Sequence, residues 1–161
     1  MKKLNHLISQ IGNYAQPVFL LLIRLYFGYQ IIESGWAHLH NVGKTAAFFS
    51  ELGIPFPELN VYFSASVELV GGALILIGLL SRLISIPLIV NFIVAIVTVN
   101  WEYPKYRDML LHPFSGDNFT DAILHDTAFP FLFIALLILL FGPGKISLDA
   151  LISADKSASA N

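Results

Sequence analysis

The sequence has no cysteine and few charged residues, and both shortages restrict its chemistry. Without a thiol the chain cannot form disulfides, use a cysteine nucleophile or hold a Cys-ligated metal or Fe–S cluster. Gly-rich phosphate loops of the dinucleotide-binding and P-loop types are also absent. The net charge of −2 is too small to indicate a nucleic-acid partner.

Long apolar runs are what the sequence does contain. Hydrophobic residues make up 56% of the chain and charged residues 12%, against about 45–50% and about 25% in soluble domains. The runs cover Pro17–Ile32, Val61–Leu80, Leu83–Val99 and Ala128–Phe141. A bilayer core of about 30 Å needs about 20 apolar residues per helix, so these runs predict membrane-spanning helices.

The expected fold class is all-α: an integral membrane four-helix bundle with an N-terminal amphipathic interfacial helix. We expect one transmembrane domain over residues 1–152, with spans at about 17–36, 61–80, 83–100 and 122–141. Apolar residues at helical spacing predict the interfacial helix over residues 3–15.

Several local signals refine this expectation. Pro17 is expected to start the first span, because a proline at the first helical position loses no hydrogen bond. Thr45–Leu52 predicts a short amphipathic helix between the first two spans. Gly71 and Gly72 predict close helix packing. The polar tail, residues 153–161, is expected to be disordered.

The distribution of basic residues predicts the orientation. With four spans, both termini share a side with the short turn at Ser81-Arg82. That side carries Lys2, Lys3, Arg82, Lys145 and Lys156, and the other side carries Lys44, Lys105 and Arg107. The positive-inside rule therefore places both termini in the cytoplasm.

Ionisable residues lie within or at the ends of three apolar runs: Arg24, Glu33, Glu68 and the pair His125–Asp126. A charge at the centre of such a helix costs about 2.5–3.5 kcal/mol on insertion scales, so each of these groups needs a partner or a function.

Helix rise predicts where these groups meet. Glu33, His38, Glu68, Asn100, His125 and Asp126 are expected in one outer half-layer, with Arg24 and Asn91 deeper. We predict a polar pocket that opens outward, with Glu68 at its floor. The candidate ligand-binding or proton-relay residues are Arg24, Glu33, Glu68, Asn91, His125 and Asp126, and none is assigned a catalytic role.

A quinone is the ligand that this chemistry favours. Carboxylates in a low-dielectric site titrate near neutral pH, so Glu68 and Asp126 could relay protons to a quinone carbonyl that His125 binds. A metal site built from the acidic residues and His125 matches no familiar ligand spacing, and no metal is predicted.

The same residues have structural interpretations, which stay open at this point. Arg24 and Glu68 could form an ion pair that fixes the register of two helices. Glu33 could be solvated at the interface. His125 and Asp126 could begin a helix, where a carboxylate is favoured, and an asparagine within a span more often bonds a neighbouring helix.

Four segments of the sequence resemble the DoxX family of small bacterial membrane proteins. They are Leu21–Gly28, Phe48–Pro57, Val67–Arg82 and Gly142–Asp149, within a similarity that covers about residues 15–151. The run from Glu68 to Arg82 and the Gly-Pro-Gly ending make the resemblance specific.

The resemblance implies four transmembrane helices in the bacterial cytoplasmic membrane. Relatives in this family are named for a subunit of thiosulfate:quinone oxidoreductase, and others associate with redox-defence enzymes. By motif, Arg24, Glu68 and Arg82 correspond to family-type polar positions. The chain departs from the family at Ser115–Asp126, where many relatives have a Gly-rich acidic segment.

Three functions compete on this basis. The first is a redox-associated accessory subunit of a quinone-linked oxidoreductase, which would need a soluble or membrane redox protein as partner. The second is a non-catalytic binder or carrier of a small hydrophobic or anionic molecule. The third is a structural membrane subunit. The lipid bilayer is the expected environment in each case, and a homo-oligomer is compatible with all three.

Overall fold

The computed structural model describes residues 2–102 and 128–159, and these residues form six helices. They are α1 (Lys2–His40), α2 (Val42–Glu51), α3 (Pro57–Ile77), α4 (Ser81–Glu102), α7 (Ala128–Phe141) and α8 (Leu148–Ser159). Among the described residues, three stretches are long and apolar enough to cross a membrane: Tyr14–His40, Pro57–Ile77 and Ser81–Val99. The expected all-α membrane protein is thus confirmed.

The fourth expected span corresponds to α7 only in part. The span was predicted at about 122–141, and its first residues lie outside the described part of the chain. The described part, α7, has 14 residues, which gives a length of about 21 Å at helix rise. On its own this length falls short of a hydrocarbon core of about 30 Å.

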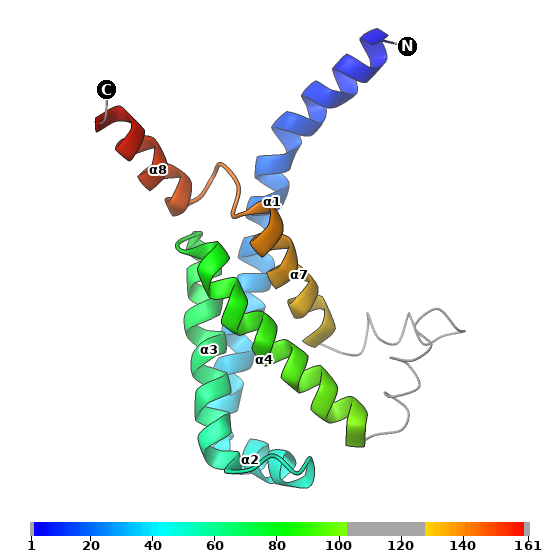
Figure 1. Ribbon diagram of the computed structural model, residues 1–161, viewed down its shortest axis with the longest axis vertical. Coiled ribbons are helices and arrows are strands. Elements are labelled where there is room, and N and C mark those ends of the chain that lie inside the picture. Colours follow the sequence, from blue (N-terminus) through cyan, green and yellow to red (C-terminus); the bar gives the residue numbers. More distant parts are fainter. Residues whose placement is uncertain (1, 103–127, 160–161) are drawn as a thin grey trace.

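Four helices pack around one apolar core. In Figure 1, α1 lies along α3, and α4 lies between α3 and α7, in agreement with the contacts between these elements. The core consists of Ile31, Ile75, Leu88, Phe92, Phe131, Ile134, Ala135 and Ile138. Exposed aliphatic and aromatic side chains cover the outside of the bundle, as expected for helices that face acyl chains.

Two neighbouring glycines of α3 bring other helices close on two sides. A Cβ atom on Gly72 would lie 2.8 Å from the carbonyl oxygen of Gly28 in α1. A Cβ atom on Gly71 would lie 2.8 Å from the side chain of Leu88 in α4. Small residues allow such close contact in lipid, where packing takes over the role that the hydrophobic effect plays in water.

The N-terminal segment differs from the sequence-based expectation. A separate interfacial helix over residues 3–15 was expected, but α1 is one continuous helix from Lys2 to His40 that passes through Pro17. A change from amphipathic to apolar composition does not interrupt the backbone. A single proline removes one hydrogen bond and need not end a helix that is flanked by helix-forming residues.

The C-terminal tail also differs, because α8 continues to Ser159 where disorder was expected from residue 153. The hydroxyl of Ser147 accepts a hydrogen bond from the amide of Ala150 at 3.2 Å, which caps the first turn of α8. Asp149 lies in that first turn, where a carboxylate is favoured by the helix dipole. These start signals outweigh the polar composition.

The expected short helix between the first two spans is present as α2. It occupies Val42–Glu51, close to the predicted Thr45–Leu52. In Figure 1, α2 lies at one end of the bundle, whereas both termini and the α3–α4 turn lie at the other. The bundle therefore has one end that carries α2 and another that carries the α3–α4 turn. Each buried polar group can be described by the end to which it is closer.

Candidate functional site

Glu68 is a buried carboxylate near the middle of a candidate membrane span. Its residue is 4% exposed, and it lies eleven residues from Pro57 and nine from Ile77 within α3. At helix rise these separations are about 16 Å and about 14 Å. A carboxylate at this depth is costly unless it is paired or protonated.

Two neighbouring helices supply polar partners to Glu68. The side-chain amide of Asn91 in α4 donates a hydrogen bond to Glu68 Oε1 at 3.0 Å. On the other side, His38 Nδ1 of α1 lies 3.4 Å from Glu68 Oε2. His38, Glu68 and Asn91 therefore form a polar cluster across three helices, which we call the Glu68 cluster.

The contact between His38 and Glu68 is within ion-pair distance but is not a regular hydrogen bond. His38 Nδ1 and Glu68 Oε2 are both buried, and neither has a hydrogen-bond partner among the described residues. The His38 side chain is nonetheless 33% exposed, so its exposed area lies on atoms other than Nδ1. The imidazole thus connects the surroundings of the bundle with a buried carboxylate.

His38 was assigned to the expected outer layer but was left out of the candidate site residues. A signal for it exists in the sequence. The buried positions of α1 include Arg24, Gly28, Ile31 and Gly35, which follow a spacing of three and four residues. Continuing that spacing reaches His38, so the helical period alone places its side chain on the face that contacts α3.

Arg24 lies at the other end of the bundle and does not pair with Glu68. Its residue is 2% exposed. The guanidinium donates to the carbonyl oxygens of Ile75 at 3.0 Å and Leu76 at 3.3 Å. It also donates to those of Pro143 at 2.6 Å and Ile146 at 2.9 Å.

These four bonds give Arg24 a structural position. Ile75 lies seven residues along α3 from Glu68, about 10 Å at helix rise. The alternative of an Arg24–Glu68 ion pair is therefore not realised in the structure. The fork of the guanidinium instead joins α1 to the end of α3 and to the loop between α7 and α8.

A second contact close to that loop is made by Asp149 of α8. Its two carboxylate oxygens accept hydrogen bonds from the amides of Leu80 at 2.8 Å and Ser81 at 3.0 Å. These amides belong to the first residue of α4 and to the residue before it, so Asp149 caps α4 from a distant part of the sequence. Gly78 (φ 73°) ends α3 here, and a Cβ atom on it would lie 2.6 Å from Ser147 Cβ.

The remaining candidate residues do not join the Glu68 cluster in the described part of the chain. Glu33 is exposed on α1, in line with a solvated or interfacial carboxylate. Asn100 belongs to α4, but its side chain is outside what the structure describes. His125 and Asp126 lie outside the described residues, so the predicted contribution of the last span to the pocket stays a prediction.

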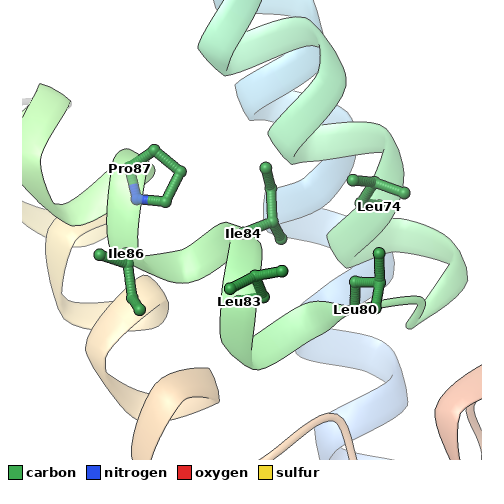
Figure 2. Close-up of a pocket in the computed structure, with 6 residues that line it drawn as sticks. All are labelled: Leu74, Leu80, Leu83, Ile84, Ile86 and Pro87. Atoms are coloured by element: carbon green, nitrogen blue, oxygen red, sulfur yellow. The ribbon is translucent and has the colours of Figure 1, made fainter.

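An apolar cavity lies closer to the Arg24 end of the bundle. Its volume is about 300 Å³, and its lining consists of Leu74, Leu80, Leu83, Ile84, Ile86 and Pro87. Figure 2 shows these side chains along α4 and at the end of α3, with Leu83 and Leu80 near the turn. No polar side chain lines it, so its occupant must be apolar.

The fold and the Glu68 cluster define a helical membrane protein with a buried polar site between its spans. The DoxX family matches residues 19–101, which include His38, Glu68 and Asn91. The chain belongs to the DoxX family.

Two relatives extend this comparison. The chain is 29% identical over 92 residues to a protein named putative oxidoreductase CatD from Bacillus subtilis (strain 168), which covers 57% of this chain and 67% of that protein. It is also 29% identical over 147 residues to the uncharacterised membrane protein Rv3486 of Mycobacterium tuberculosis (strain ATCC 25618 / H37Rv), which covers 88% of this chain and 86% of that protein. No solved structure matches the chain.

Proposed function

We propose that this chain is a redox-associated membrane subunit that binds the headgroup of a quinone-like molecule at the Glu68 cluster. The proposal depends on one observation: His38 Nδ1 and Glu68 Oε2 are buried, 3.4 Å apart, and lack hydrogen-bond partners among the described residues. A ligand that offers both acceptors and donors would satisfy them. A quinone offers carbonyl acceptors, and a quinol offers hydroxyl donors.

The cluster divides the work among its three residues. Asn91 holds Glu68 Oε1 by its hydrogen bond and thereby orients Oε2 away from α4. Glu68 takes up or gives up a proton at Oε2, and His38 exchanges a proton between Nδ1 and its exposed edge. Reduction of one quinone to a quinol consumes two electrons and two protons. These residues supply the proton path.

The electrons must come from a partner. The chain has no cysteine, and the described residues contain no group of three or more metal-ligating side chains. We therefore assign electron donation to a soluble or membrane-bound redox protein that associates with the chain. The printed name of the Bacillus subtilis relative, putative oxidoreductase CatD, supports an oxidoreductase context.

We place the protein in the bacterial cytoplasmic membrane, with α7 as the core of a fourth crossing and both termini in the cytoplasm. Both termini and the α3–α4 turn lie at one end of the bundle (Figure 1), as four crossings require. The basic residues near that end favour the cytoplasmic side. The Glu68 cluster then opens toward the outer half of the membrane, on the side of α2.

Quinone binding can be measured through the fluorescence of Trp36, which lies two residues before His38 on α1 and is quenched by a nearby quinone. The experiment uses the full chain in detergent micelles, with Trp101→Phe as background, and the short-tailed decylubiquinone. We expect saturable quenching, and about tenfold weaker binding after Glu68→Gln.

Glu33→Gln is the matched control, because Glu33 is an exposed carboxylate on the stretch of α1 that also carries Trp36 and His38. Its affinity should stay at the level of the parent protein. If the parent protein shows no saturable quenching, or if Glu33→Gln weakens binding as much as Glu68→Gln, the quinone proposal is wrong.

A structural role is the second candidate, and the hydrogen bond between Asn91 and Glu68 favours it. A polar bond between helices fixes register in a membrane without any ligand. Under this alternative, Glu68→Gln preserves the bond to Asn91 as an amide pair. This substitution would leave the fold unchanged. The quinone-linked redox activity of membranes that contain the variant would equal that of membranes with the parent protein.

A further inference from the structure

The apolar cavity beside the α3–α4 turn is independent of the Glu68 cluster and has a different chemistry. Its volume is about 300 Å³, which reaches the lower end of the range of small-molecule sites. Its lining residues Leu83 and Ile86 are 64% and 50% exposed. They belong to a stretch that is long and apolar enough to cross a membrane, so the cavity opens toward acyl chains.

A cation lies about one helical turn from a residue that lines this cavity. Arg82 is exposed in the first turn of α4. Arg82 and Ile86 are four residues apart, so they lie on the same side of that helix. The guanidinium lies near the loop after α7, since a Cβ atom on Gly142 would lie 3.3 Å from Arg82 Nε and Nη2.

The charge of Arg82 is not neutralised within the described part of the chain. No hydrogen bond or ion pair involving its guanidinium occurs among residues 2–102 and 128–159. Asp149 in the first turn of α8 accepts hydrogen bonds from two backbone amides, one of them that of the neighbouring Ser81. Lys145 adds a second exposed cation three residues after Gly142.

We propose that this cavity binds one acyl chain of an anionic phospholipid, whose phosphate is bound by Arg82. The two parts of the site match the two parts of the lipid: an apolar slot within the membrane span, and a basic group at the end of the helix where headgroups lie. A polar headgroup cannot enter a cavity with this apolar lining, and a soluble anion has no apolar part that the cavity could bury. The bound lipid would hold the ends of α3 and α4 together beside the loop that precedes α8.

The test measures lipids retained by the purified full chain. The protein is reconstituted in nanodiscs of equal parts dioleoyl phosphatidylglycerol and dioleoyl phosphatidylcholine, released into mild detergent, and analysed by native mass spectrometry. We expect one retained phosphatidylglycerol per chain. We also expect about fivefold weaker retention after Arg82→Gln, the effect of one basic residue near an anionic lipid.

Substitutions that fill the cavity test the apolar half of the proposed lipid site. Ile86→Trp should abolish retention, whereas Ile93→Trp should not. Ile93 lies two turns along the same face of α4, has a similar exposure of 45%, and is outside the cavity. Leu83→Trp fills the slot from another position, so a folding defect in one variant does not decide the result. Lys44→Gln, at the opposite end of the bundle, is the charge control.

Three results would overturn the proposal. The first is equal retention of phosphatidylcholine and phosphatidylglycerol, which would leave only an ordinary lipid annulus. The second is retention that Lys44→Gln reduces as much as Arg82→Gln does. The third is retention that survives both tryptophan variants of the slot. None of these results bears on quinone binding at Glu68, so the two proposals fail separately.

Discussion

The side-chain amide of Asn91 donates a hydrogen bond to Glu68 Oε1 at 3.0 Å and so joins α3 to α4 inside the bundle. The opposite carboxylate oxygen, Oε2, faces His38 Nδ1 of α1 at 3.4 Å. Oε1 is therefore the fixed half of the carboxyl group, because the hydrogen bond from Asn91 sets its orientation. Oε2 is the adjustable half, where a ligand or a proton can act.

The fixed half can be tested by removing Asn91. Asn91→Leu leaves Glu68 Oε1 buried without a donor, which costs about 1–3 kcal/mol in the free energy of unfolding. The double variant Glu68→Leu/Asn91→Leu removes both polar partners and should recover much of that loss. Unfolding by SDS titration in mixed micelles, run as a double-mutant cycle, measures the coupling. Additive losses would mean that the two side chains do not interact.

The Arg24 contacts predict that no other side chain can replace this arginine. Arg24→Lys keeps the charge but offers one ammonium in place of a planar fork, so it cannot reach carbonyls on both α3 and the loop after α7. Losing two of the four bonds to a charged donor should cost about 3 kcal/mol in the free energy of unfolding.

Thermal unfolding in detergent, followed by circular dichroism, measures this effect, with Lys44→Arg as a control at an exposed position of α2. If Arg24→Lys unfolds at the temperature of the parent protein, the carbonyl bonds do not stabilise the bundle.

Much of this architecture follows from the sequence, because the bilayer fixes the length of its spans. The apolar runs predicted the three crossing stretches within α1, α3 and α4. The position of Glu68 on the inner face follows from the same three- and four-residue spacing that buries Val61, Ala65 and Ile75. A carboxylate on that face predicts a polar site without any knowledge of the other helices.

The partners of Arg24 were beyond sequence reasoning for a physical reason. Opposite charges suggest pairing between side chains, and Glu68 was the obvious candidate. The structure instead satisfies the guanidinium with backbone carbonyls at a helix end and in a loop, and such carbonyls are present at every residue. Only the three-dimensional course of the Gly142–Ser147 loop determines which of them are free.

The Asp149 contact predicts a link between α8 and the α3–α4 turn. Asp149→Ala leaves the amides of Leu80 and Ser81 without their acceptor, which costs about 0.5–2 kcal/mol, as the loss of a helix cap does. Because these bonds also hold α8, trypsin should cleave at Lys145 several times faster in the variant. Asp155→Ala, on the exposed face of α8, is the control and should be cleaved at the rate of the parent protein. Equal cleavage of all three proteins would contradict the link.

The contact between α1 and α3 leads to the most specific prediction, because the chain contains a matched control. In Gly72→Ala, the added methyl group would lie 2.8 Å from the carbonyl oxygen of Gly28 and 2.9 Å from the backbone nitrogen of Ile32. Backbone atoms cannot move aside as the end of a side chain can, so the two helices must separate. Overpacking of this kind costs about 1–3 kcal/mol in the free energy of unfolding.

Gly43→Ala makes the same chemical change on α2, where a Cβ atom would meet nothing within 4 Å. There the higher helix propensity of alanine should stabilise the protein by up to about 1 kcal/mol. The two variants are therefore expected to shift the unfolding midpoint in opposite directions.

Since Gly72 lies four residues from Glu68 on α3, separation of the helices should also lengthen the contact between Glu68 and His38. Gly72→Ala should then weaken decylubiquinone binding, while Gly43→Ala leaves it unchanged. If both alanine variants have the same stability, α1 and α3 are not in backbone contact at Gly72, and the geometry of the Glu68 cluster would have to be reconsidered.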